Sequence, residues 1–195
     1  MQTTFWPHKI TVLERELLLT GIGGQGVQLA AQIVAKAAIA SGREVQVFGS
    51  YGGMMRGGST DATLVVGDGA IESPPTVTNA WSAVLVHPEY AAPALVRVRR
   101  GGLVLFNETL FATVPVEGAI GVPATALGGA PVNASLVLVG AYLAISDLVS
   151  LDAALAAVDD ALPPYRRQHA DGCRAALRTG YAAAPAGTRY EAWAA

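Results

Sequence analysis

The sequence predicts an α/β fold, namely a three-layer Rossmann-like domain with a mostly parallel sheet and helices on both faces. Two observations lead to this prediction. The apolar run at residues 17–19 meets a glycine-rich stretch at residues 20–26, and a helical pattern follows, as in the first βα unit of such sheets. Further apolar runs of strand length alternate with helical patterns along the 195-residue chain, a length that suits one domain.

The glycine-rich stretch is the strongest candidate for a binding loop. Gly21, Gly23 and Gly26 satisfy the pattern G-x-G-x-x-G, with Gly24 and Gln25 between them. Glycines let the backbone turn sharply and approach a ligand closely, and the free N–H groups of the next helix suit an anion. We expect the loop to face a phosphate, a cofactor or a partner subunit. The alternative interpretation is a tight turn needed only for packing.

A dinucleotide site of the usual kind is disfavoured by the second strand, residues 44–48. Such a site needs an acidic residue near the end of that strand to hold the ribose, and Glu44 lies at its start. A free-standing nucleotide-binding or CoA-binding protein remains an alternative, although the acidic residue expected of a dinucleotide site is absent.

A second glycine-rich segment, residues 49–59, follows the second strand and contains five glycines among eleven residues. Because parallel strands present their carboxyl ends at one edge, we expect it beside the first loop. Arg56 is its only charged residue. It could offer a guanidinium to phosphate or carboxylate, or pair with an acid at an interface.

The remaining elements follow from apolar periodicity and from capping residues. The predicted strands are residues 61–66, 82–87, 103–106 and 119–122, and the predicted helices are residues 27–41, 89–99, 134–148, 150–162 and 163–179. Asn133 is the expected N-cap of the apolar helix, and Gly180 the expected stop of the last one. Tyr165, His169 and Cys173 are expected on the inward face of the last helix. The tail, with Tyr190 and Trp193, is a candidate for packing on a partner.

Composition narrows the classes of function. Apolar residues make up 52% of the chain and charged residues 14%, against about 25% charged residues in a typical soluble chain. We therefore expect other chains to cover part of its surface; a bland, alanine-rich domain is the alternative. The net charge of −2 disfavours nucleic acid as a partner. The chain has no apolar run long enough for a signal peptide or a membrane span. We therefore expect a cytoplasmic protein.

The sequence offers no catalytic constellation. A lone cysteine cannot build a cysteine-based metal site or an iron–sulfur cluster, and the three histidines have no recognisable spacing. We find no carboxylate pair, phosphate-loop motif or nucleophile elbow. We therefore assign this chain neither catalytic nor metal-binding residues and expect the chemistry on another chain.

With these motifs in view, the chain resembles the γ subunit, or γ domain, of 2-oxoacid:ferredoxin oxidoreductases. The resemblance is carried by motifs in a fixed order: residues 19–27, Ser50-Tyr51-Gly52, Arg56-Gly57-Gly58, residues 71–74, Pro131-Val132-Asn133 and residues 175–181. It covers about residues 16–182, so we divide the chain into an N-terminal extension (1–15), a γ-type domain (16–182) and a tail (183–195).

The resemblance implies an activity that belongs to a complex. Enzymes of this type oxidatively decarboxylate a 2-oxoacid to an acyl-CoA, with thiamine diphosphate, Mg²⁺ and [4Fe-4S] clusters held by α, β and δ (ferredoxin-like) subunits. Electrons pass to ferredoxin or, through a further subunit, to NAD. The γ domain would pack on the catalytic subunits and help to enclose CoA. The residues implied for this role are Gly21, Gly23, Gly24, Gln25, Gly26, Ser50, Tyr51, Gly52, Arg56, Gly57, Gly58 and Asn133.

One departure from the family pattern stands in the second glycine segment. Where the family reads S-Y-G-P-E-x-R-G-G, this chain has Gly53-Met54 in place of Pro-Glu. The change removes a rigid φ angle and a carboxylate. Arg56 is therefore expected to be either freer than in the family or paired elsewhere. Pyruvate, branched-chain 2-oxoacids, 2-oxoglutarate, indolepyruvate and phenylglyoxylate all stay open as substrates.

Overall fold

The computed structural model describes residues 12–51, 58–74 and 76–194 of the chain. Within them, six strands form one sheet in the order β2-β3-β1-β4-β5-β6. The strands are β1 (Glu14–Ile22), β2 (Glu44–Tyr51), β3 (Ser59–Gly67), β4 (Ala80–Leu85), β5 (Val98–Asn107) and β6 (Ile120–Val122). Three of the five strand pairings are parallel, and β3 runs against both of its neighbours. The predicted mostly parallel α/β sheet is confirmed.

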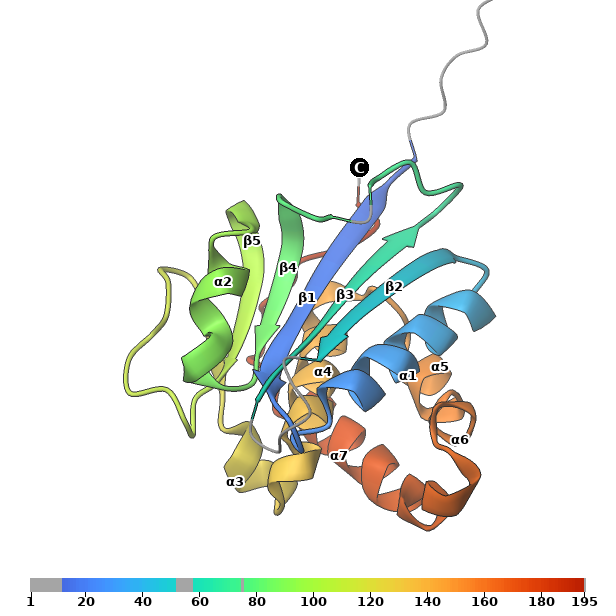
Figure 1. Cartoon of the computed structure of the whole chain (residues 1–195), viewed down its shortest axis with the longest axis vertical. Helices are drawn as coiled ribbons and strands as arrows, with labels where there is room; N and C mark the ends of the chain where they lie inside the picture. The colour runs from blue at the N-terminus through green and yellow to red at the C-terminus, as the bar shows by residue number, and fades with distance from the viewer. Residues whose placement is uncertain (1–11, 52–57, 75, 195) are drawn as a thin grey trace, which may run out of the picture.

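Helices cover the two faces of this sheet unequally (Figure 1). One face carries α1 (Val27–Ala40) and α4 (Ala134–Ser146), and α7 (Ala170–Ala182) packs on α4. The short helices α3 (Ala124–Gly128), α5 (Leu151–Ala156) and α6 (Val158–Ala161) lie in the same group. The opposite face carries α2 (Ala91–Leu95), so the third layer is present but thin.

The core of the larger layer lies between the sheet and the helices α1 and α4. Leu17 and Leu19 of β1 face α1 and α4, whereas Leu18 faces α2, as the alternation of strand side chains requires. Helix α4 is buried nearly all round, because the sheet lies on one side of it and α7 on the other. No helix within the described residues is long and apolar enough to span a membrane.

Three helix predictions need correction. The helix expected over residues 89–99 is a 3₁₀ turn (Pro88–Tyr90) and α2, which ends at Leu95, because Arg97 and the residues after it pair with β4. The helix expected over 150–162 begins at the predicted cap Ser150 but divides at Ala157 into α5 and α6. A 3₁₀ segment (Pro164–His169) precedes α7.

Gly180 does not stop α7, and two residues expected on the inward face of this helix are exposed. The helix continues to Ala182, because Gly180 lies at a close crossing with α4. Cys173 is buried as predicted, whereas Tyr165 and His169 are exposed because they precede the α-helix in the 3₁₀ segment.

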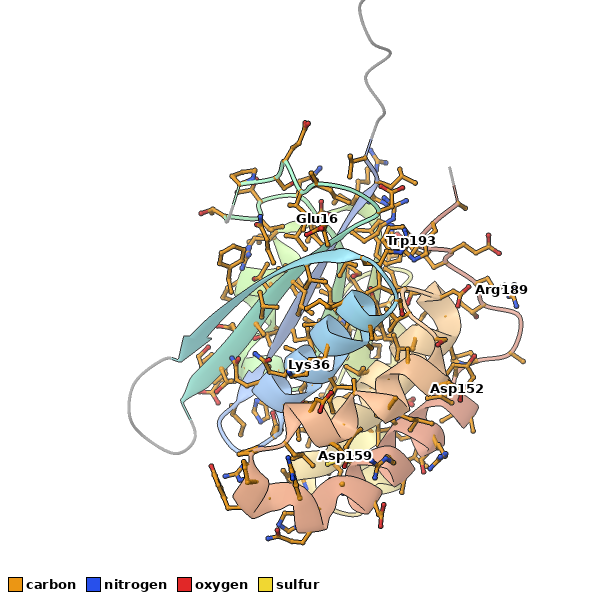
Figure 2. The ribbon with its side chains drawn as sticks, turned by 90° about the vertical axis from the view of Figure 1, so that its right-hand side faces the viewer. Glu16, Lys36, Asp152, Asp159, Arg189 and Trp193 are labelled. Atoms are coloured by element: carbon orange, nitrogen blue, oxygen red, sulfur yellow. The ribbon has the colours of Figure 1, made fainter. Side chains whose placement is uncertain are left out.

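The C-terminal tail packs on its own domain. The backbone N–H of Tyr190 donates to the carbonyl of Ile145, and that of Ala192 to Ser146, each at 2.7 Å. The indole N–H of Trp193 donates to the carbonyl of Leu148 at 3.0 Å. Figure 2 shows Trp193 toward the end of the molecule where Glu16 lies, away from Asp159. The tail thus closes the end of the sheet opposite to the glycine loop.

Candidate functional site

The glycine loop joins the end of β1 to the start of α1 by a backbone that needs glycine at two positions. Gly24 has φ of 100° and Gly26 has φ of 82°, in the left-handed region that other residues rarely adopt. Gly26 is also the N-cap of α1, and no side chain caps this terminus. Gly23 and Gly24 are exposed, so the turn presents bare backbone at the carboxyl edge of the sheet.

Close packing explains two of the loop glycines. A Cβ on Gly26 would lie 2.5 Å from the carbonyl oxygen of Val132, and one on Gly21 would lie 3.1 Å from the Cβ of Val86. Gly24 differs, because a Cβ there would meet nothing within 4 Å. Gly24 is therefore required for its φ angle and not for space. A larger residue there would be unfavourable because of backbone strain, without any crowding.

Gln25 braces the loop from inside. Its side-chain Oε1 accepts a hydrogen bond from the backbone N–H of Ile22 at 3.0 Å, and the side chain is 5% exposed. Its backbone carbonyl accepts from the hydroxyl of Ser135, a fully buried residue of α4, at 2.7 Å. The structure therefore places Gln25 behind the exposed turn, where it fixes the conformation of Gly23 and Gly24.

The second glycine segment approaches the first loop as expected. The N–H of Gly23 donates to the carbonyl of Gly58 at 2.9 Å. This contact forms because β3 enters the sheet next to β1 and pairs Ser59 with Ile22. The backbones of Ser50 and Tyr51 end β2 at the same edge. The predicted residues Gly52, Arg56 and Gly57 lie outside the described residues.

Asn133 also lies at this edge, at the N-cap position of α4. Its side chain does not cap the helix; instead its Nδ2 donates to the carbonyl of Gly128 at 2.9 Å. This bond holds α3 against the start of α4. The neighbouring Val132, whose carbonyl touches Gly26, is 48% exposed, and Leu127 of α3 is 41% exposed. Bare glycine backbone and apolar side chains thus share one surface.

Sequence reasoning missed Asn107, which ties three elements together below this surface. It is fully buried at the end of β5, and its Nδ2 donates to the hydroxyl of Thr125 at 2.8 Å and to the carbonyl of Val86 at 3.3 Å. The backbone N–H of Thr125 donates back to Oδ1 of Asn107 at 3.2 Å. An asparagine directly after the apolar run 103–106 was the available signal, because a buried amide needs several partners.

His87 and Cys173 have structural roles. Nδ1 of His87, two residues after β4, accepts from the backbone N–H of Glu89 at 3.3 Å and so caps the 3₁₀ turn. Burial raises the pKa of the Cys173 thiol, which is far from a reactive thiolate. Within the described ranges no three histidine, cysteine or acidic side chains gather as metal ligands.

Known proteins with similar sequences and folds agree on one family. Residues 16–183 match the family described as pyruvate ferredoxin/flavodoxin oxidoreductase. The 2-oxoglutarate synthase subunit KorC of Methanothermobacter thermautotrophicus is 28% identical over 78% of this chain and 87% of that subunit. The ketoisovalerate oxidoreductase subunit VorA of the same organism is 30% identical over 71% of this chain, but the match covers 30% of VorA.

A solved structure extends the likeness to three dimensions. The γ subunit of a keto/oxoacid ferredoxin oxidoreductase from Geobacter sulfurreducens superposes with a TM-score of 0.71 at 26% identity, covering 87% of this chain and 98% of that one. The fold is that of a γ-type subunit of an oxidoreductase complex. This chain belongs to the pyruvate ferredoxin/flavodoxin oxidoreductase family, as a γ subunit of the 2-oxoacid:ferredoxin oxidoreductase type.

Proposed function

We propose that this chain is the structural γ subunit of a thiamine-diphosphate-dependent complex that oxidatively decarboxylates a 2-oxoacid to an acyl-CoA. Its partners are α, β and δ subunits, which hold thiamine diphosphate, Mg²⁺ and the [4Fe-4S] clusters. Electrons leave to ferredoxin or, through a further subunit, to NAD. Membership in the family supports the class of reaction, and the single, buried cysteine supports clusters on other chains.

The observation that carries the role of this chain is the exposed turn at Gly23 and Gly24. Its backbone lies before the N-terminus of α1, which has no acidic residue in its first turn, so the helix dipole favours an anion there. The exposed Val132 and Leu127 beside it suit an apolar cover. We infer that this edge helps to enclose CoA, with the glycine turn toward its phosphates and the apolar residues against a catalytic subunit.

The residues at this edge suit CoA better than a metal ion or an iron–sulfur cluster. The described residues hold no group of three metal ligands, and the chain has one cysteine. Gly23 and Gly24 are exposed and carry no side chain, so the backbone of the glycine turn is open to a phosphate. When bound, CoA supplies the thiol that accepts the acyl group. This chain would bind and orient the CoA and exclude water, and it moves no proton of its own.

The test is to purify the chain from its native source and to identify what comes with it. Co-purified larger chains with iron–sulfur absorption and CoA-dependent oxidation of a 2-oxoacid are expected. The panel starts with 2-oxoglutarate and a branched-chain 2-oxoacid, because KorC and VorA are named for these compounds. A colourless, stable monomer that binds NAD or CoA by calorimetry would contradict the proposal and favour a free-standing binding protein.

A substitution at Arg56 tests the second glycine segment in the purified complex. Arg56→Ala should raise the KM for CoA or weaken subunit assembly while the melting temperature of the chain stays unchanged, because it removes an anion-binding guanidinium. Arg178→Ala on the exposed side of α7 is the matched control. Unchanged assembly and KM would show that Arg56 is a surface charge.

A further inference from the structure

A small cavity with both polar and apolar walls lies on the α2 side of the sheet, directly below the glycine edge. Its volume is about 60 Å³, and its lining includes Thr20, Asp61, Thr63 and Arg97. Thr20 immediately precedes Gly21, so the cavity adjoins the candidate site from the face opposite to α1. One water molecule needs roughly 10–15 Å³ of such space, so the cavity has room for a group of about four heavy atoms.

The donors of the cavity belong to Arg97, which is held in place by its neighbours. Its Nε donates to the carbonyl of Val77 at 2.8 Å, and one terminal nitrogen lies 3.4 Å from the hydroxyl of Thr63. Among the described residues, Arg97 has no carboxylate within 4.0 Å. Its guanidinium therefore keeps N–H groups for an occupant of the cavity.

The acceptors lie on β1 and β3. One carboxylate oxygen of Asp61 accepts from the hydroxyl of Ser59 at 2.9 Å, and the other oxygen has no hydrogen-bond partner within the described part of the chain. The hydroxyl of Thr20 donates to the carbonyl of Tyr90 at 3.1 Å, which leaves its oxygen lone pairs available. The cavity thus combines one cationic donor with two acceptors.

This combination selects the charge of the occupant. The carboxylate of Asp61 disfavours an anion in the cavity, and the guanidinium of Arg97 disfavours a cation. A neutral group with one acceptor for Arg97 and one donor for Asp61 can bond to both. A single amide has this chemistry and about this size. We propose that the cavity is a socket for one amide group, whose carbonyl oxygen accepts from Arg97 and whose N–H donates to Asp61.

The inference rests on the proposed function, because two sources of an amide then adjoin this edge. One source is the pantetheine arm of CoA, which contains amide groups, and the other is the polypeptide of the catalytic subunit. Both sources offer the same hydrogen-bonding group. If the amide belongs to CoA, loss of its contact with the cavity weakens CoA binding. If it belongs to the catalytic subunit, loss of the contact weakens assembly.

The experiment uses the co-expressed complex with Asp61→Val, which removes the acceptor and keeps a strand-forming residue. If the amide belongs to CoA, the KM for CoA rises about tenfold with unchanged assembly, as expected for one lost hydrogen bond. If it belongs to the partner subunit, the dissociation constant of the subunits, measured without CoA, rises about tenfold and the KM per assembled complex is unchanged. Either result supports the socket. Thr63→Val, which frees Arg97 from its hydroxyl partner, gives a second, smaller loss should Asp61→Val fold poorly.

Two further variants decide whether hydrogen bonding is responsible. Asp61→Asn keeps a carbonyl oxygen and should retain most of the wild-type behaviour. Glu44→Val also replaces a carboxylate by valine, at an exposed position on β2, and should change neither constant. The inference is overturned if Asp61→Val matches the wild type, which would mean that the cavity holds water, or if Asp61→Asn loses as much as Asp61→Val. A wild-type chain that does not assemble with a 2-oxoacid oxidoreductase would instead refute the proposed function, and the inference with it.

Discussion

The crossing of α4 and α7 allows a sharp test of the packing that supports the site. A Cβ on Gly180 would lie 1.8 Å from the carbonyl oxygen of Val137, and one on Gly140 would lie 2.1 Å from the carbonyl oxygen of Leu177. Ordinary contacts begin at about 3.4 Å, so Gly180→Ala is expected to push the two helices apart. The obstacle is backbone, which no change of rotamer can relieve.

The expected loss combines two opposing effects. Replacing a helical glycine by alanine gains about 1 kcal/mol of helix propensity. Overpacking of this kind costs roughly 1–3 kcal/mol and occasionally more, and here the upper end applies because both helices are buried at the crossing. We expect Gly180→Ala to lower the free energy of unfolding by about 2 kcal/mol, which lowers Tm by roughly 4–8 °C for a domain of this size.

The same helix provides the control. Gly172 lies on the exposed side of α7, and a Cβ there would meet nothing within 4 Å. Gly172→Ala should therefore raise the stability by about 0.5–1 kcal/mol. Thermal and urea unfolding of the full chain, followed by circular dichroism, measure both changes. Gly180→Ala with a Tm at or above the wild type would refute the reasoning, and so would a loss of similar size in Gly172→Ala.

Three further predictions concern single groups. Gly24→Ala should lower the free energy of unfolding by about 1–2 kcal/mol because of its φ angle; an unchanged urea midpoint would contradict this. Ser135→Ala should cost about 1–3 kcal/mol and speed amide exchange at residues 22–26, because the buried carbonyl of Gln25 loses its donor; unchanged exchange would show that the loop is fixed by other contacts. Cys173 should react with a disulfide reagent far more slowly in the folded chain than in urea, and, since its pKa is raised on folding, its contribution to stability should fall as the pH rises above the ordinary thiol pKa; equal rates would show that the thiol is accessible.

The local pattern of the sequence was sufficient for most of the larger elements. The run 17–19 and the helical stripe after Val27 became β1 and α1, because burial of one apolar face dictates both periods. The apolar segment after Asn133 became α4. The helix predicted to Arg99 failed because pairing of β5 with β4 overrides the helical tendency of residues 97–99.

The sequence predicted the glycine turn of the candidate site but not the contacts that fix it. The glycines at positions 21–26 predicted a turn, but the sequence did not show why each position requires glycine. Gly26 is required because a Cβ would meet the carbonyl of Val132, more than a hundred residues away in the chain. Gly24 is required because of its own φ angle. The inward direction of Gln25 was also hidden, because its partners are a loop amide and the distant Ser135.

The sequence by itself determined the class of fold, the glycine turn at the end of the first strand and the resemblance to γ subunits, because these depend on neighbours along the chain and on motifs in order. Tertiary structure alone decided that β3 enters antiparallel beside β1 and brings Gly58 to Gly23, that Gly140 and Gly180 let two helices touch, and that the tail closes its own sheet. These features depend on contacts between segments far apart in sequence, where spacing and periodicity carry no information.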